Sequence, residues 1–273
     1  MGKVLIIDNT KCNGCYNCQL SCKDEHVGND WTPIAKPQPD TGHFWWKISE
    51  IVQGSVPKVR VRYKHDVCQH CDDAPCMASC PTKAIYKRDD GIVILDPEKC
   101  RGSRTCVDAC PYGAIYYNAD LNIAQKCTWC AHLLDDGWSE PRCVHSCPTD
   151  ALIFGEESDL QDEIAKAERM NPEWGTGPRV YQIEPPNKVF VAGEVYDPVE
   201  DECLKGATVT LSDADGNKLA SLETDGFGDF WFERQLPGQY ALKIEMPGYI
   251  TRSIDAVDAS KDINVGGIEL QKA

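Results

Sequence analysis

The sequence predicts an α+β protein in which a cysteine-rich N-terminal domain precedes an all-β antiparallel sandwich or barrel. Three observations predict this architecture. Fifteen of the 16 cysteines lie between Cys12 and Cys147. A polar segment with several prolines and glycines follows, and from Lys188 onward apolar and polar residues alternate between turn signals. We therefore expect a cysteine-rich domain over 1–155, a helix and linker over 156–187, and a seven-stranded β domain over 188–273.

The charge of the chain excludes several classes of function. The 273 residues carry 43 acidic and 28 basic side chains, a formal net charge of −15, whereas nucleic acids and anionic lipids both bind basic surfaces. No apolar stretch approaches the roughly 18 residues of a membrane span, and Cys12 leaves no room for a signal peptide. We expect a cytoplasmic protein without nucleic-acid or membrane partners. Disulfides are rare in that compartment, so the cysteines need another role.

The N-terminal cysteines form four motifs that repeat one spacing. Motif one is C-x2-C-x2-C-x3-C, motif two C-x2-C-x4-C-x3-C and motif four C-x2-C-x12-C-x3-C, whereas motif three has Ser103 where a cysteine would complete it. A proline follows the last cysteine of motifs two, three and four. The members are, in order, Cys12, Cys15, Cys18 and Cys22; Cys68, Cys71, Cys76 and Cys80; Cys100, Cys106 and Cys110; and Cys127, Cys130, Cys143 and Cys147.

This spacing is typical of iron–sulfur cubes, each of which needs four thiolates. A tight loop supplies three of them, and the last cysteine of each motif ligates the other cluster of a pair, as in bacterial ferredoxins. The proline ends the helical turn, and apolar strands expected around Ile85, Ile115 and Leu152 would cover the clusters. A zinc site built from two C-x2-C pairs leaves the fourth cysteine and the proline unexplained, and a disulfide framework is less favoured still.

The order of the motifs resembles that in the iron–sulfur subunits of molybdopterin oxidoreductases, including dimethyl sulfoxide reductase, nitrate reductase and formate dehydrogenase. The resemblance covers about residues 1–155 and includes the long gap of motif four. It also includes Cys68-Gln69-His70-Cys71, Ala74-Pro75-Cys76, Asp90-Gly91-Ile92-Val93, Cys110-Pro111-Tyr112 and Cys147-Pro148-Thr149. It implies two tandem bacterial-ferredoxin-like modules, in which motif one pairs with motif four and motif two with motif three.

That pairing implies three complete [4Fe-4S] sites, which we call sites A, B and C. Site A takes the first three cysteines of motif one and the last of motif four, and site B takes the reverse combination. Site C takes three cysteines of motif two and the last of motif three. The ligands are Cys12, Cys15, Cys18 and Cys147 for site A; Cys127, Cys130, Cys143 and Cys22 for site B; and Cys68, Cys71, Cys76 and Cys110 for site C.

A fourth site, site D, would take Cys80, Cys100, Cys106 and position 103, where Ser103 supplies no thiolate. A serine hydroxyl is a much poorer iron ligand than a cysteine thiol, because it holds its proton far more tightly than a thiol does. The site is then vacant, holds a [3Fe-4S] cluster, or holds a cube with an unusual ligand. We favour vacancy, since twelve other thiols suffice for three cubes and the cations Arg101 and Arg104 could fill the lost volume.

Residues 23–67 form an insertion between motifs one and two. Its large aromatic side chains are expected to pack over the clusters or against a partner subunit; they are Trp31, Phe44, Trp45 and Trp46. Histidines inside the motifs could hydrogen-bond sulfide, although a plain structural role is favoured; they are His70, His132 and His145.

The segment after motif four is expected to contain a helix followed by a linker. Ser158 and Gln161 are typical of a capping box, which predicts a helix from Ser158 to Met170. The prolines and glycines of residues 173–187 predict a linker on the surface.

The C-terminal residues resemble the transthyretin-like modules found beside carboxypeptidases. The resemblance rests on Gly193–Asp197, Gly206–Val209, Thr224–Phe230 and Leu236–Tyr240. Such modules are usually accessory folding or docking domains. The aspartates near the turns are expected to cap those turns rather than to bind calcium, and Cys203 is expected to ligate nothing; the aspartates are Asp213, Asp215 and Asp225.

These features together predict an electron-transfer subunit with no catalytic residue of its own. Fusion of a four-motif domain to a transthyretin-like domain, with one cysteine of motif three missing, resembles the small-subunit family of pyrogallol–phloroglucinol transhydroxylases. That resemblance implies a large partner subunit, which carries molybdenum with bis(molybdopterin guanine dinucleotide) and the active site. The alternatives are a subunit of another soluble molybdenum reductase or dehydrogenase, a free-standing polyferredoxin, and a protein whose clusters serve only as folding staples.

Overall fold

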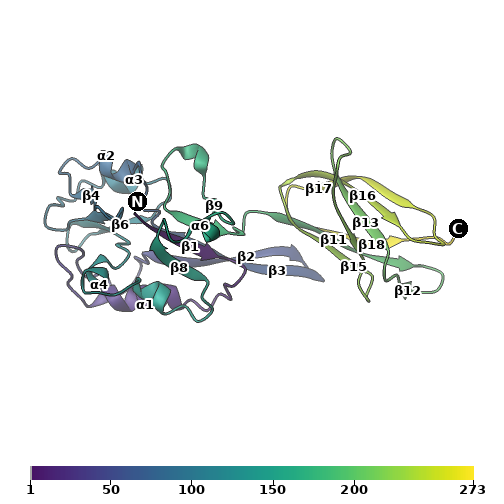
Figure 1. Ribbon diagram of the computed structural model, residues 1–273, viewed down its shortest axis with the longest axis horizontal. Helices are drawn as coiled ribbons and strands as arrows, with labels where there is room; N and C mark the ends of the chain where they lie inside the picture. The colour runs from purple at the N-terminus through teal and green to yellow at the C-terminus, as the bar shows by residue number, and fades with distance from the viewer. Residues whose placement is uncertain (1) are drawn as a thin grey trace. The chain divides into compact units, whose positions relative to one another are not determined.

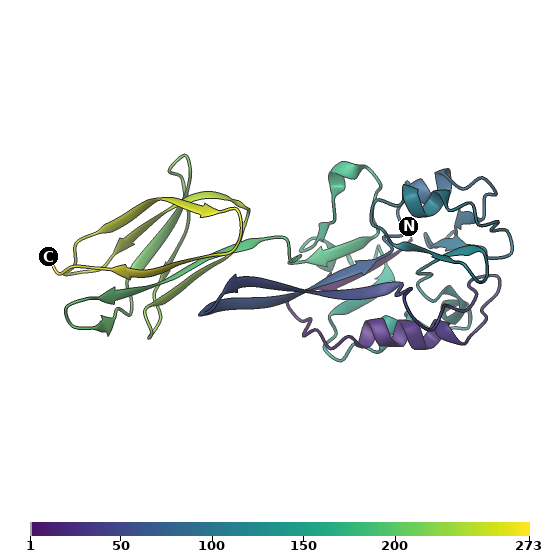
Figure 2. The ribbon, with the colours of Figure 1, turned by 180° about the vertical axis from the view of Figure 1, so that it is seen from behind.

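The computed structural model describes residues 2–273, and the chain divides into two compact units. The cysteine-rich unit contains the described residues up to Glu50 together with Tyr63–Pro186. The β unit contains Ile51–Arg62 and Asn187–Ala273. Figures 1 and 2 show the ribbon from opposite sides, with the short elements of the cysteine-rich unit distinct from the long strands of the β unit.

A four-stranded sheet forms the centre of the cysteine-rich unit, in the order β8-β1-β10-β9. Strand β1 (Lys3–Asp8) pairs antiparallel with β8 (Leu152–Glu156) and parallel with β10 (Val180–Ile183), which pairs with β9 (Glu168–Arg169). The apolar run at the N-terminus is continuous because both faces of β1 are covered. Leu5 and Ile7 pack into the core that contains thiols, and Val4 and Ile6 pack on the opposite face.

The structure differs from the sequence prediction after motif four. Helix α6 (Gln161–Ile164) is a single turn, and its N-terminus has no side-chain cap. The chain then forms β9, a 3-10 turn η1 (Pro172–Trp174) and the buried strand β10. The expected helix to Met170 is therefore wrong, and residues 180–183 are a buried strand instead of a surface linker. The reason is tertiary, because β10 completes a sheet whose central strand lies more than 170 residues earlier.

Short helices and hairpins surround the cysteines. Helix α1 (Asn17–Val27) lies against α5 (Arg142–His145), and α2 (Pro75–Ala78) lies against α3 (Thr105–Ala109). The remaining elements are the hairpin of β4 (Ile85–Lys87) and β5 (Val93–Leu95), the hairpin of β6 (Ile115–Asn118) and β7 (Ile123–Lys126), and α4 (Ala131–Asp135).

The segment after each motif-ending proline repeats in structure as it does in sequence. The second residue after the proline has a left-handed backbone in all three copies, with φ of 52° at Lys83, 60° at Gly113 and 51° at Asp150. A short strand follows in each case, namely β4, β6 and β8. The expected short strands are confirmed, and the apolar residues that begin them are buried; they are Ile85, Ile115 and Leu152.

The insertion forms a two-stranded hairpin of β2 (Trp46–Ser55) and β3 (Lys58–Val67). Its base belongs to the cysteine-rich unit and its tip, Ile51–Arg62, to the β unit. Gly54 allows the tip to pack closely, because a Cβ on it would lie 2.4 Å from the Lys58 carbonyl oxygen and 2.5 Å from the Phe190 ring. One side of the β unit is therefore supplied by residues far earlier in the chain.

The β unit contains two sheets around one apolar core. The first consists of β12 (Glu202–Cys203), β11 (Val189–Asp197), β15 (Asp229–Gln235) and β18 (Ile263–Glu269). The second has the order β14 (Lys218–Glu223), β13 (Thr208–Asp213), β16 (Gly238–Glu245) and β17 (Arg252–Ala259). The expected sandwich is not wholly antiparallel, because β18 pairs parallel with β11, and the two-residue β12 brings the expected seven strands to eight.

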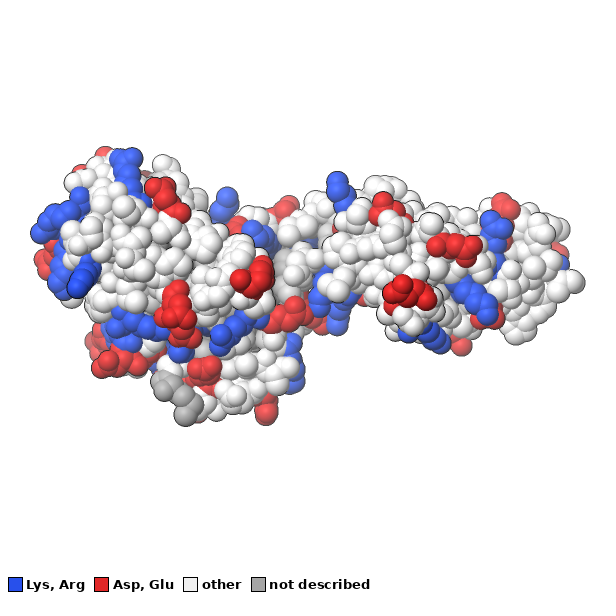
Figure 3. Space-filling view, turned by 90° about the horizontal axis from the view of Figure 1, so that it is seen from above, with Lys and Arg blue, Asp and Glu red and all other residues white. Residues whose placement is uncertain are grey.

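Charged side chains of both signs lie next to one another over the face drawn in Figure 3. Turn aspartates of the β unit accept backbone hydrogen bonds, as expected: Asp213 from Asp215 and Asn217, and Asp225 from Phe227 and Asp229. Within residues 2–273, the structure contains no helix long and apolar enough to span a bilayer.

Candidate metal centres

Motifs one and four come together where α1 lies against α5. Helix α1 carries Cys18 and Cys22, and Cys143 lies on α5. The hydroxyls of Ser21 and Ser146 are 2.8 Å apart and join the two helices. Two groups of thiols, those of sites A and B, lie at this junction.

The thiols of site A are close enough to influence one another's ionisation. Burial raises the pKa of Cys18 to about 12, and the charges of Cys12, Cys147 and Cys15 contribute to that shift. These four cysteines line one pocket, together with Ile48, His65 and Leu152. The loop between Cys12 and Cys15 depends on Gly14, which has φ 69° and leaves no room for a Cβ against the Tyr63 ring. Cys15 is exposed, so site A reaches the surface of its unit.

Site B is the most deeply buried group. Burial raises the pKa of Cys143 well above its ordinary value, and the charges of Cys130, Cys22 and Cys127 raise it further. The pKa of Cys22 is raised in the same way by burial and by Cys127 and Cys130. The structure thus brings together the four thiols that the family resemblance assigned to site B.

Site C lies where α2 meets α3. Burial raises the pKa of Cys76 to about 12, with contributions from the charges of Cys68, Cys110 and Cys71. The structure adds a residue that sequence reasoning missed, Thr176 from the expected linker. Its hydroxyl lies 2.7 Å from the Tyr112 hydroxyl. The Thr176 side chain also hydrogen-bonds the Cys71 side chain, and this contact lowers the pKa of Cys71, whereas burial raises it.

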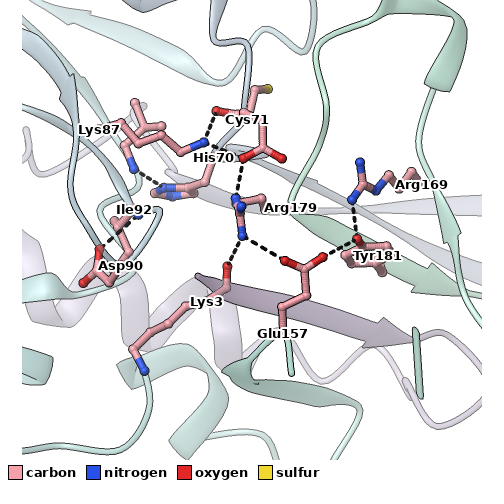
Figure 4. Close-up of polar contacts among 12 residues, drawn as sticks. Lys3, His70, Cys71, Lys87, Asp90, Ile92, Glu157, Arg169, Arg179 and Tyr181 are labelled. Carbon is pink, nitrogen blue, oxygen red and sulfur yellow. Dashed lines mark hydrogen bonds and ion pairs between the residues drawn. The ribbon is translucent and has the colours of Figure 1, made fainter. Parts of the chain in front are cut away.

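Ion pairs hold the loop of site C against the central sheet. Arg179, which precedes β10, donates to Asp72 at 2.6 Å and to the Lys3 carbonyl at 3.4 Å. Lys87 also donates to Asp72 and to the Cys71 carbonyl. Figure 4 shows these groups converging from the N-terminal strand, motif two and the segment before β10. The segment expected to be a linker therefore helps to position a cysteine motif.

Site D brings together three thiols. Burial raises the pKa of Cys106 to about 11, and the charges of Cys100 and Cys80 raise it further. The Ser103 hydroxyl lies 3.2 Å from that of Thr105, which donates to the Ser79 carbonyl.

The two arginines beside site D have other partners. Arg101 donates to the carbonyls of Glu98 and Cys100, at 2.6 and 2.9 Å. The Arg104 guanidinium lies 3.7 Å from the centre of the Tyr117 ring. These contacts do not by themselves place either cation among the three thiols.

The chemistry of sites A, B and C fits iron–sulfur clusters. All 16 cysteines are free, and the buried thiols face one another with raised pKa values, so a cationic centre is needed to hold them as thiolates. Several buried polar atoms in the same unit have no partner among the described residues, and inorganic sulfide could accept hydrogen bonds from the donors among them; they include Trp45 Nε1, Trp129 Nε1, His26 Nδ1, His65 Nε2, His70 Nε2 and Thr128 Oγ1. In residues 2–273, no three His, Cys, Asp or Glu side chains are placed to hold a single metal ion.

Aromatic rings of the insertion pack on the histidines near site B. His26 lies 4.6 Å from Trp45 and 5.4 Å from His132, which stacks on Trp31 at 4.3 Å between ring centres. The Nε2 atom of His26 is 3.8 Å from Cys130 Sγ. Burial lowers the pKa of His26 to about 3, so this imidazole is neutral at pH 7. Trp45 belongs to the apolar core that contains thiols of sites A, B and C, and Trp31 packs against that core. Packing over bound clusters or against a partner subunit stays a prediction.

Family comparisons identify the class of both parts of the chain. Residues 59–157 match the family described as a 4Fe-4S dicluster domain, and residues 191–269 match the carboxypeptidase regulatory-like domain. The chain therefore combines an iron–sulfur domain with a carboxypeptidase regulatory-like β domain.

Whole-chain comparisons define the family more narrowly. The chain is 38% identical to the pyrogallol hydroxytransferase small subunit of Pelobacter acidigallici, over 97% of this chain and 98% of that protein. It is 35% identical to a putative iron-sulfur subunit of dimethyl sulfoxide reductase from Halobacterium salinarum, over 66% of this chain and 78% of the relative. It is 31% identical to an arsenate respiratory reductase iron-sulfur subunit of a Shewanella strain, over 66% and 94%. The chain belongs to the family of iron–sulfur subunits of molybdopterin oxidoreductases, as its motifs indicated.

Proposed function

We propose that the chain is the electron-transfer subunit of a molybdenum enzyme and holds three [4Fe-4S] clusters at sites A, B and C. The observation that carries the proposal is the succession of these sites. The charge of Cys18 in site A raises the pKa of Cys22 in site B. The charge of Cys68 in site C likewise raises the pKa of Cys127 in site B. Neighbouring sites suit electron transfer along the chain, in one-electron steps that the clusters supply when bound.

The residues of this chain hold, insulate and tune the clusters. Buried apolar strands exclude water from the buried thiols, above all those of site B, which strengthens the electrostatic interactions there. Buried donors without protein partners, such as Trp45 and Trp129, are available to sulfur and would set the potentials. No step of substrate chemistry is assigned to this chain.

We propose a large partner subunit that carries molybdenum with bis(molybdopterin guanine dinucleotide) and the active site, and that transfers hydroxyl groups between pyrogallol and phloroglucinol in the cytoplasm. The support is a match to a pyrogallol hydroxytransferase small subunit over nearly the full length of both chains, whereas the reductase relatives above match over 66%. Hydroxyl transfer is redox-neutral overall, so the clusters would load or poise the molybdenum.

Co-purification with the native partner tests this function. We expect molybdenum in the complex, and conversion of pyrogallol with phloroglucinol formation in the absence of an external electron acceptor. Turnover that requires an external acceptor would instead support a reductase or dehydrogenase subunit. A chain that carries iron but purifies without a molybdenum partner would support a free-standing polyferredoxin.

Iron analysis of the same complex tests site D. We propose that it is vacant, because Ser103 supplies no thiolate. The expected content of this chain is about twelve irons, four for each of three cubes. About fifteen irons, with a three-iron signal in electron paramagnetic resonance of the oxidised protein, would contradict vacancy.

A further inference from the structure

Lys126, the last residue of β7, is a buried cation between two of the proposed cluster sites. It is 1% exposed and directly precedes Cys127 of site B. Its Nζ lies 3.7 Å from Cys68 Sγ, which belongs to site C. One ammonium group therefore lies where these two sites adjoin.

The partners of Lys126 hold its ammonium in place without neutralising it. Nζ donates to the carbonyl oxygens of Val93 and, at 2.8 Å, Cys127, and its third contact is the Cys68 sulfur. None of these groups is a carboxylate. A lysine is almost never fully buried unless its charge is compensated, because removing an ammonium from water is costly.

Negative charge at sites B and C would supply this compensation. The Lys126 charge lowers the pKa of Cys76, Cys110 and Cys127, in opposition to the burial that raises them. The Lys126 charge therefore lowers the pKa of thiols of both sites. Its ammonium contacts the sulfur of Cys68, which belongs to site C. Net charge and hydrogen bonds to sulfur are among the factors that set the reduction potential of an iron–sulfur cluster.

We propose that Lys126 is a fixed positive charge that raises the reduction potential at site C above the value its thiols alone would give, and so favours electrons on site C over site B. The inference rests on the proposed function, since it requires clusters at both sites. One-electron reduction of a cluster at site C would add one negative charge, which the nearby Lys126 ammonium would stabilise. Lys126 is thus a positioning residue for the electron and takes no part in bond chemistry.

Lys87 provides a matched control. It also lies beside site C, and its Nζ is 3.4 Å from the Cys71 carbonyl oxygen. Its charge is paired with Asp72, and its side chain is 25% exposed. Solvent and the carboxylate screen this charge, so removing it should change the potential at site C much less.

The experiment is a redox titration of the holo-complex, followed by electron paramagnetic resonance. Lys126→Met removes the charge and the donor, Lys126→Gln removes the charge but keeps a donor, and Lys87→Met is the control. We expect one of the reduction steps to move to lower potential in both Lys126 variants, with unchanged iron content. The step should move much less in Lys87→Met.

Each other outcome has a defined meaning. Unchanged potentials in iron-replete Lys126 variants would overturn the inference, and so would an equal shift in Lys87→Met. If Lys126→Met loses iron, Lys126→Gln decides; loss of iron from both would make the lysine a folding residue and overturn the inference. A wild-type chain that holds no iron–sulfur cluster would instead overturn the proposed function.

Discussion

The two units of this chain satisfy their buried groups in opposite ways. The β unit is built from long paired strands over an apolar core, which includes Val191, Leu211 and Ile244. Its buried Thr224 hydroxyl accepts from the Ala207 amide and donates to the Leu204 carbonyl. In the described part of the chain, the unpartnered buried polar side-chain atoms all lie in the cysteine-rich unit.

The difference indicates that the residues of the β unit suffice to stabilise it, whereas the cysteine-rich unit also depends on a bound group. The cysteine-rich unit has helices of only four or five residues apart from α1, and it buries thiols that repel one another as thiolates. A bound cationic centre is therefore part of its folding free energy. The β unit has no such requirement. Four predictions test this comparison, from the largest expected effect to the smallest.

Iron removal should separate the two units most clearly. Chelation under anaerobic conditions is expected to abolish most hydrogen-exchange protection in the cysteine-rich unit, because its thiols and orphaned donors lose their partners. The β unit should keep its protection. Mass spectrometry of peptides from β1 and from β13 measures both in one sample. Full protection of β1 in iron-free protein would break the comparison.

Loss of a single ligand should lower the iron content of one site. Cys143 is buried among the thiols of site B, so Cys143→Ser is expected to remove about four irons per chain. The matched control is Cys203→Ser, since Cys203 is exposed in β12 of the β unit. Iron analysis with electron paramagnetic resonance measures both. Loss of iron from the Cys203 variant would contradict the assignment.

A cavity in the β core should destabilise that unit and leave the iron in place. Leu211 is fully buried, so Leu211→Ala is expected to lower the unfolding free energy of the β unit by about 2–5 kcal/mol. Leu219→Ala is the control, because Leu219 is 49% exposed and its loss should cost less than about 0.5 kcal/mol. Denaturant titration with hydrogen exchange measures the change. A fall in iron content would show that the units are coupled.

A residue of the hairpin tip should affect the β unit although it lies early in the chain. Lys58 forms an ion pair with Asp229, and its Nζ is 5.5 Å from the centre of the Trp231 ring. Lys58→Met leaves the Asp229 carboxylate without this ion pair, so we expect the unfolding free energy of the β unit to fall by about 1–2 kcal/mol. Lys64→Met, whose exposed side chain pairs with Asp66 in the cysteine-rich unit, should leave the β unit unchanged. An effect on iron content instead would place the tip functionally with the clusters.

Local patterns predicted much of the candidate site. The spacing of cysteines within a motif indicates a tight loop, which depends only on residues close together in the sequence. The ligand groups of sites A, B and C could therefore be predicted once the family's pairing of motifs was applied. The strands after Pro81, Pro111 and Pro148 follow from the same short range. The sequence also indicated part of the set of buried hydrogen-bond donors, because tryptophans and histidines cluster in and around the motifs.

The sequence by itself determined the division into a cysteine-rich part and a β part, the four motifs and the missing ligand at Ser103. Only the tertiary structure decided that β10 belongs to the central sheet, that the hairpin tip belongs to the β unit, and that Lys126 lies between sites B and C. The physical reason is range. Turns and metal loops are dictated by neighbouring residues, whereas strand partners and buried charges depend on groups that folding brings together from distant parts of the chain.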